Sequence, residues 1–128
     1  MVTPVSQPDN YEVARKFLDA AVLRQQAIAA NIANSETPGY RRVDLAPDFE
    51  TQLSARIRAG DSASSLAGVQ PRLAVDTMAR TTRPDGNTVE LEHELVAMNR
   101  NAVQYEFLTN IVSNHLKELK LAITGHSV

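Results

Sequence analysis

Apolar residues recur at helical spacing early in the chain, in steps of three and four. Asp9 or Asn10 can cap the start of this pattern, which predicts a helix of about 24 residues, about 36 Å long at 1.5 Å per residue. Gln25 is the one polar residue in the stripe, and we interpret it as a tolerated edge residue; the alternative is that it fixes the register between helices. The stripe consists of Tyr11, Ala14, Leu18, Ala21, Gln25, Ile28 and Ile32.

The helical pattern ends before the turn Thr37-Pro38-Gly39-Tyr40. Proline has no N–H and disfavours helical backbone in the residue before it, so the helix must stop before Thr37. Asn34 is a candidate left-handed cap. The four residues fit a type II turn, with proline second and glycine third. We therefore expect the chain to reverse or bend sharply at this point.

The segment 41–86 is polar and irregular. Its pattern gives a brief alternation of apolar and polar residues at 43–45, a short helix from 48 to about 60, a flexible loop at 61–68 and a weak strand signal within 70–82, where Leu73 and Val75 alternate with other residues. Its arginines are scattered among acidic residues, so we interpret them as solvated groups or as groups that pair with another subunit. They are Arg41, Arg42, Arg56, Arg58, Arg72, Arg80 and Arg83.

A second turn, at 83–87, precedes the longest periodic pattern of the chain. A calcium-binding loop would need further oxygen ligands here, where apolar residues stand instead. Asn87 can cap a helix together with Glu90, three residues later, and Gly125 can end it. The pattern predicts a helix over 87–124 of about 37 residues, about 55 Å long. Its first apolar stripe contains Leu91, Leu95, Met98, Ala102, Tyr105, Thr109, Val112, Leu116, Leu119 and Ile123.

A second apolar stripe lies roughly opposite the first on this long helix. The first stripe can pack on the N-terminal helix, whereas the second has no partner unless the middle segment folds over it. Because that segment is polar, we expect helices of other subunits to cover the second stripe. The isolated monomer would then be partly disordered. The stripe consists of Val89, Val96, Val103, Phe107, Ile111 and Leu121, of which Val96, Val103, Phe107 and Ile111 are the intersubunit candidates.

The predicted fold is mainly α, with long N- and C-terminal helices packed as a coiled-coil-like pair. An irregular middle segment would carry a short helix and weak β-hairpin or strand elements. The expected divisions are a flexible N-terminus at 1–9, the N-terminal helix and turn at 10–40, the middle at 41–86, the long helix at 87–124 and a tail at 125–128.

Composition narrows the class of function. A formal net charge of −2 provides no concentrated basic face for nucleic acid or for an acidic membrane surface. The absence of cysteine excludes a disulfide framework, a thiolate nucleophile and a cysteine metal site. No stretch approaches the length of a membrane span, and the first ten residues do not resemble a cleaved signal peptide.

No pattern in the sequence predicts catalysis, a metal, a cofactor or a small-molecule substrate. His93 and His115 would lie about 33 Å apart on one straight helix, too far to share a metal within one subunit, and His126 falls in the tail. Glu90 and Glu94 are expected at a solvated helix start, which forms no pocket. Nucleophile-elbow and phosphate-loop motifs are absent. We expect a structural protein rather than an enzyme.

The stretch ANIANSETPGY, at 30–40, resembles the N-terminal signature of bacterial flagellar axial proteins, which comprise the rod, hook and hook-adaptor subunits. The segment 85–95, with Tyr105 and the segment 119–123, looks most like a proximal rod subunit of the B type, and the related C-type subunit is the alternative. The residues that match the signature are Asn31, Ala33, Asn34, Thr37, Gly39 and Tyr40, and Pro38 is typical of the rod members.

This resemblance implies a structural subunit of the proximal rod, the drive shaft of the flagellar basal body. The terminal helices would form an inner layer that polymerises around an export channel. Asn31 and Asn34 would hold the angle at which the chain leaves this two-helix layer. The implied partners are other rod subunits, both copies of itself and the C-type, the hook-basal body junction protein, the membrane ring and the export gate. The implied location is the periplasmic rod, reached by type III export without a cleaved signal peptide. An alternative of another class is a soluble helical adaptor.

Overall fold

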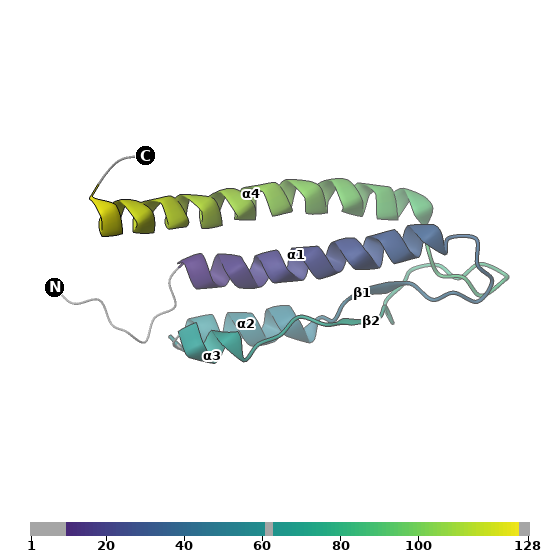
Figure 1. Cartoon of the computed structure of the whole chain (residues 1–128). Coiled ribbons are helices and arrows are strands. Elements are labelled where there is room, and N and C mark those ends of the chain that lie inside the picture. The colour runs from purple at the N-terminus through teal and green to yellow at the C-terminus, as the bar shows by residue number, and fades with distance from the viewer. Residues whose placement is uncertain (1–9, 61–62, 126–128) are drawn as a thin grey trace.

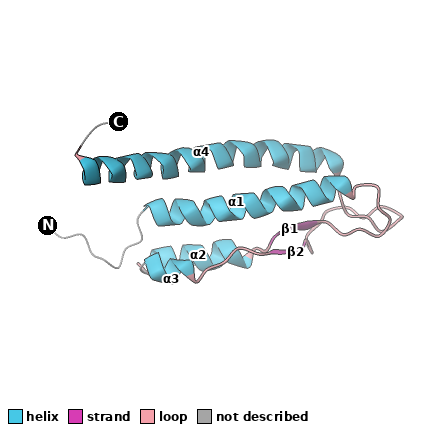
Figure 2. Ribbon diagram, viewed as in Figure 1, coloured by secondary structure: helices cyan, strands magenta, loops and turns pink. Residues whose placement is uncertain are grey.

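The computed structural model describes residues 10–60 and 63–125 as three layers (Figures 1 and 2). Helix α4 (Leu91–Thr124) lies antiparallel to α1 (Asn10–Ala33) on one side, and the middle segment packs against the other side of α1. The predicted fold class is confirmed. The predictions for Asp9, the flexible N-terminus, the tail after Gly125 and His126 lie outside the described residues.

The two long helices follow the predicted pattern, with one correction. Helix α1 has 24 residues, the predicted length. Helix α4 has 34 residues and begins at Leu91, so the predicted start at Asn87 was wrong. The buried side chain of Asn87 bonds to the first turn and does not cap the helix. Gly125 ends α4 as predicted: its φ is 69°, and its N–H donates to the Leu121 carbonyl at 2.8 Å.

The middle segment contains two strands and two short helices. The predicted strands pair with each other, antiparallel, with Asp44 opposite Ala74. The predicted helix is present and stops before Gly60, whose φ is 71°. The expected flexible loop at 61–68 was wrong over its described part, because Leu66 is fully buried and holds a helical turn in place. The elements are β1 (Val43–Leu45), α2 (Asp48–Arg58), α3 (Ala63–Ala67) and β2 (Leu73–Val75).

The hydrophobic core lies between α1 and the middle segment. Phe17 of α1 meets Phe49 of α2 edge to face, with ring centroids 6.3 Å apart. The middle segment therefore covers α1 and leaves the part of the second stripe that lies on α4 largely open, where Val103 is 68% and Phe107 is 64% exposed. The prediction was wrong for Val89, which precedes α4 and is buried. The buried cluster is Ala20, Leu45, Phe49, Leu53, Leu66 and Val69, with Val13, Phe17, Leu23 and Ile57 packed against it.

The face of α4 that α1 buries differs from the predicted apolar stripe. It is centred on Glu94, Asn101 and Leu108, which are all buried. A pattern that counts apolar positions missed this face, because two of these three residues are polar. Among the predicted packing residues, Ile28 is buried, and Leu18, Ile32, Met98 and Val112 are half-buried. The prediction was wrong for the remaining six, which are 43–82% exposed: Leu91, Leu95, Tyr105, Leu116, Leu119 and Ile123.

Helix α4 also extends past the beginning of α1 (Figure 1). Tyr11, in the first turn of α1, stacks on His115 with ring centroids 4.3 Å apart. The following nine residues of α4, 116–124, span about 14 Å with no turn of α1 opposite them. This overhang explains why the apolar side chains at the end of α4 are exposed. In the described part of the chain, no helix is both long and apolar enough to cross a membrane.

Candidate functional site: the docked turns and the surfaces of α4

The first turn has the predicted backbone. Gly39 has a φ of 75°, and the Tyr40 N–H donates to the Thr37 carbonyl at 3.2 Å. Asn34 is not left-handed, since only glycines have a positive φ among the described residues, so that part of the prediction was wrong. The Asn34 amide instead donates to the Ala30 carbonyl at 2.8 Å and accepts from the Thr37 hydroxyl at 3.2 Å.

Asn31 connects the last turn of α1 to the first strand. Its side chain is fully buried. Its Oδ1 accepts from the Val43 N–H at 3.0 Å, and its Nδ2 donates to the Val43 carbonyl at 2.8 Å. The Tyr40 hydroxyl donates to the same Oδ1 at 3.2 Å. The amide thus pairs with both backbone groups of Val43, as a neighbouring strand would, and sets where the chain leaves the helix.

Asn87 holds the second turn against the first. The side chain is fully buried, and its Nδ2 lies 3.0 Å from the Asn34 carbonyl, 3.2 Å from that of Ser35 and 2.8 Å from that of Thr37. Its Oδ1 accepts from the Val89 N–H at 2.8 Å. Sequence reasoning missed this role. Its only local signal was the position of Asn87 after Asp-Gly, which is equally typical of a helix cap.

The backbones of the two turns also bond directly. The Gly39 N–H donates to the Asp85 carbonyl at 2.8 Å, and the Thr88 N–H donates to the Tyr40 carbonyl at 3.1 Å. Gly86 has a φ of 86°, and a Cβ added to it would lie 3.4 Å from the Gly39 Cα. Glycine is therefore required where the turns meet. We call the bonded pair of segments, 34–40 and 83–89, the docked turns.

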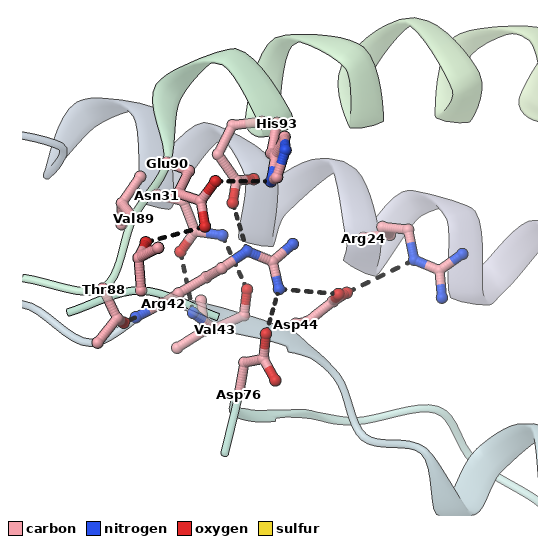
Figure 3. A network of polar contacts seen from close by, with 12 residues as sticks. Arg24, Asn31, Arg42, Val43, Asp44, Asp76, Thr88, Val89, Glu90 and His93 are labelled. Atoms are coloured by element: carbon pink, nitrogen blue, oxygen red, sulfur yellow. Dashed lines mark hydrogen bonds and ion pairs between the residues drawn. The ribbon is translucent and has the colours of Figure 1, made fainter. Parts of the chain in front are cut away.

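Beside the docked turns, Arg42 joins three elements through its guanidinium group (Figure 3). It pairs with Asp76 at 2.7 Å, with Asp44 at 3.2 Å and, through Nε, with Glu94. Burial alone would lower the pKa of Arg42, but the hydrogen bond and charge of Glu94 hold that pKa above its ordinary value. Arg42 was interpreted as a solvated group or as one that pairs with another subunit, and it instead pairs within the chain. The expectation that Glu94 is solvated was also wrong, since Glu94 is fully buried.

Other arginines interpreted as solvated also bind within the chain. Arg83 donates to the Ser35 carbonyl, across the docked turns. Arg56 donates to the Ser65 carbonyl at 2.5 Å and thereby ties α2 to α3. Nothing in the sequence distinguished these arginines from exposed ones, because their acceptors are backbone carbonyls that only the fold brings near.

Asn101 forms the polar contact in the middle of the α1–α4 interface. It is 4% exposed, and its Nδ2 donates to the Ala21 carbonyl at 2.9 Å and to Gln25 Oε1 at 3.3 Å. Gln25, interpreted as a tolerated edge residue, is thus bonded across the interface. Within the described residues, Asn101 Oδ1 and Glu94 Oε2 are buried without a hydrogen-bond partner.

The histidines do not form a site with the surrounding acids. His93 is exposed and pairs with Glu90 at 2.9 Å, whereas His115 is stacked on Tyr11. Across the residues that the structure describes, no group of three or more histidine or acidic side chains is placed to hold a metal ion.

Two surfaces of α4 remain open. On one side, a groove of about 520 Å³ follows the edge of the α1–α4 interface. On another side stand the exposed side chains of Val96, Val103 and Phe107, and the fourth intersubunit candidate, Ile111, is half-buried. The groove is lined by Ala21, Val22, Gln25, Gln26, Ala29, Met98, Asn101, Ala102 and Tyr105.

Comparison with known proteins gives a consistent set of similarities. Residues 13–41, which contain most of α1 and the first turn, match the family described as flagella basal body rod protein. The chain is 30% identical to the flagellar basal body rod protein FlgB of Salmonella typhimurium, over 91% of this chain and 97% of that protein. It is 28% identical to FlgB of Escherichia coli K12, over 85% and 91% respectively. It is 29% identical to FlgB of Borrelia hermsii, over 88% and 93%.

We expect Asn87→Asp to lower the free energy of unfolding by about 3 kcal/mol, because it places a carboxylate against three carbonyl oxygens in a buried site. Chemical denaturation followed by circular dichroism measures this change. Asn99→Asp, at an exposed position on α4, makes the same chemical change and should cost less than about 0.5 kcal/mol. Equal losses for the two variants would contradict the role of Asn87.

A second prediction concerns Tyr40, whose pKa is raised above 10.0 by burial and by the negative charge of Glu94. The folded state keeps this phenol neutral, whereas the unfolded chain ionises it near pH 10. Stability should therefore fall as the pH rises through about 10. Ultraviolet titration should detect one late-ionising tyrosine, which Tyr40→Phe removes and Tyr105→Phe retains. A late tyrosine that persists in Tyr40→Phe would refute the assignment.

Proposed function

This chain belongs to the FlgB family of flagellar basal body rod proteins, and we propose from that membership that it is a structural subunit of the proximal rod. The family is structural rather than enzymatic. The observation that carries the proposal is a similarity of 30% identity along 97% of a rod protein's length, which includes both terminal helices. The fold and the open surfaces of α4 agree with a subunit that is completed by its neighbours.

The assembly surface of this proposal is the second stripe of α4. Val103 and Phe107 of α4 are 68% and 64% exposed. Helix α1, by contrast, is covered by α4 on one side and by the middle segment on the other. Apolar side chains that line one helix face in this way are typical of an association surface. In the rod, helices of neighbouring subunits would cover this stripe and the overhang at 116–124, and folding of the subunit would be completed on assembly.

The docked turns support a particular placement of the middle segment relative to the two long helices. Because Asn87 bonds the second turn to the first, the middle segment leaves and re-enters the α1–α4 layer at the same end. The two-helix layer would line the export channel, and the middle segment would face outward. Asn31 and Asn34 would then hold the exit angle through their hydrogen bonds to Val43 and Ala30.

The proposal extends to partners and location. The partners are other rod subunits, of this kind and of the C-type, with the hook-basal body junction protein, the membrane ring and the export gate. The chain would reach the periplasmic rod by type III export. Support comes from the family membership.

Deleting the gene for this chain should abolish rod formation and swimming, and the unaltered gene should restore both. We expect Phe107→Glu to reduce swimming at least about tenfold, because it would bury a charge in an apolar interface. Met78→Glu, at a side chain of the middle segment that is 85% exposed, is the matched control and should swim normally. Electron microscopy of basal bodies provides the direct measurement. Normal rods in the deletion strain would refute the proposed function.

Hydrogen exchange separates a rod subunit from a helical adaptor. A rod subunit in dilute solution should exchange the amides of 116–124 rapidly, because α1 does not reach them. The core residues of α2 should exchange far more slowly. An adaptor would be a stable monomer or dimer, and uniformly slow exchange over 88–124 would favour that alternative.

A further inference from the structure

The second of the docked turns contains an aspartate followed by a glycine, Asp85-Gly86, the only such pair in the sequence. In a pair of this kind, the backbone nitrogen of the glycine can attack the side-chain carboxyl carbon of the aspartate. Glycine is the neighbour that hinders this attack least, because it has no Cβ and its backbone adopts the widest range of conformations. Asp85 is therefore the aspartate whose chemistry depends most on how the backbone around it is held.

The docked turns hold both reacting groups. The peptide unit that joins Asp85 to Gly86 is hydrogen-bonded at both ends, since its carbonyl accepts from the Gly39 N–H at 2.8 Å and its N–H donates to the Arg83 carbonyl at 2.8 Å. The Asp85 carboxylate accepts from the Asn87 N–H at 3.0 Å. Rotation of this peptide unit would break the first two bonds, and one of them joins the two turns.

The conformation of the second turn also keeps the nitrogen away from the carboxyl carbon. Residues 83–86 form a hydrogen-bonded β-turn with a negative φ at Asp85, as in type I. The third residue of a type I turn has a ψ of about 0°, which rotates the following nitrogen about 120° away from Cβ. A five-membered ring needs that nitrogen and Cβ eclipsed. The docked turns must therefore open before the Gly86 nitrogen can react.

Once the turns are open, the reaction takes two steps with water as its co-reactant. The Gly86 nitrogen forms a bond to Cγ of the protonated Asp85 carboxyl, and the nitrogen's proton leaves with the carboxyl OH as one water molecule. The resulting succinimide then takes up one water molecule. Cleavage of the bond between the nitrogen and the main-chain carbonyl carbon leaves the chain linked through Cβ and Cγ. The product is isoaspartate, and the mass of the chain is unchanged.

An isoaspartate at position 85 cannot restore the docked turns. The extra methylene lengthens the chain before Gly86 by about 1.5 Å, and the carbonyl that accepts from the Gly39 N–H is no longer part of the backbone. The glycines already approach so closely that a Cβ on Gly86 would lie 3.4 Å from the Gly39 Cα. A shift of this size also displaces Asn87, whose Nδ2 donates to the Thr37 carbonyl at 2.8 Å.

We propose that Asp85 is an isomerisation site controlled by the docked turns. Docking protects Asp85, and each opening of the turns exposes it to a slow conversion that docking cannot reverse. The glycine that docking requires is also the residue that makes Asp85 reactive, so every chain with this turn carries both properties. A chain whose turns stay undocked is thereby marked and removed from the folded population. This modification concerns the free chain and lies beyond the proposed function.

Peptide mapping by mass spectrometry, with electron-transfer fragmentation to distinguish isoaspartate from aspartate, tests this proposal. The purified full-length chain is incubated at mildly acidic pH with and without guanidinium chloride, beside Asn87→Ala, which removes the side chain that joins the turns. We expect isoaspartate at Asp85 to form at least about tenfold faster in Asn87→Ala and in guanidinium chloride than in the native chain. Asp76, which precedes Thr77, is the internal reference and should stay unchanged.

Two control variants separate local opening of the turns from a general loss of stability. Asn99→Ala, at an exposed position on α4, should isomerise at the rate of the native chain. Leu53→Ala, in the hydrophobic core, should isomerise more slowly than Asn87→Ala when denaturant brings both variants to the same unfolded fraction. Equal rates in these two variants would overturn the control by the docked turns.

Two further outcomes would contradict the proposal. Equal rates of isomerisation in the native chain and in guanidinium chloride would show that docking gives Asp85 no protection. The isomerised chain, separated by chromatography and refolded, should have a denaturation midpoint as low as that of Asn87→Ala. Recovery of the native midpoint would show that isoaspartate at this position is compatible with docking.

Discussion

The buried amide of Asn87 shares its two hydrogens among the carbonyls of Asn34, Ser35 and Thr37, which follow the end of α1. A helix end leaves carbonyls that need donors, and a buried carbonyl without one is costly. Here a donor comes from a residue fifty or more positions away in the sequence, so the turn that follows α1 is held only where the chain returns just before α4. The middle segment must therefore fold as a loop anchored at both ends.

Polar residues perform the same task inside the helix pair. Asn101 bonds to α1, and Glu94 bonds to Arg42, so the relative position of α4, α1 and the strands is defined by directional contacts. This arrangement leaves two buried oxygens without a partner. An apolar interface would avoid that cost but would permit sliding along the helices. Buried polar groups thus specify one alignment, which a repeating assembly needs because every subunit must present its surfaces at the same angle.

The distribution of covered faces explains where neighbours can bind. Helix α1 is the central layer, with α4 on one side and the middle segment on the other, and its open surface is mainly the edge that lines the groove beside α4 (Figure 1). Helix α4 is covered on one face only, and its last nine residues lie beyond α1. In this structural subunit of the proximal rod, the open surface of the described residues is therefore concentrated on α4, and its extent depends on the length of that helix.

The sequence by itself determined the local structure: the length of α1, the turn at Gly39, the helix at 48–58, the strands and the end of α4 at Gly125. These features follow from periodicity and from the backbone preferences of proline and glycine, which act over a few residues. The family resemblance also depended on one continuous stretch. Only the tertiary structure decided the roles of Asn87, Arg42 and Glu94 and the buried face of α4. Each depends on partners 50 or more residues away, and a polar residue satisfied at that distance has the same local pattern as a solvated one.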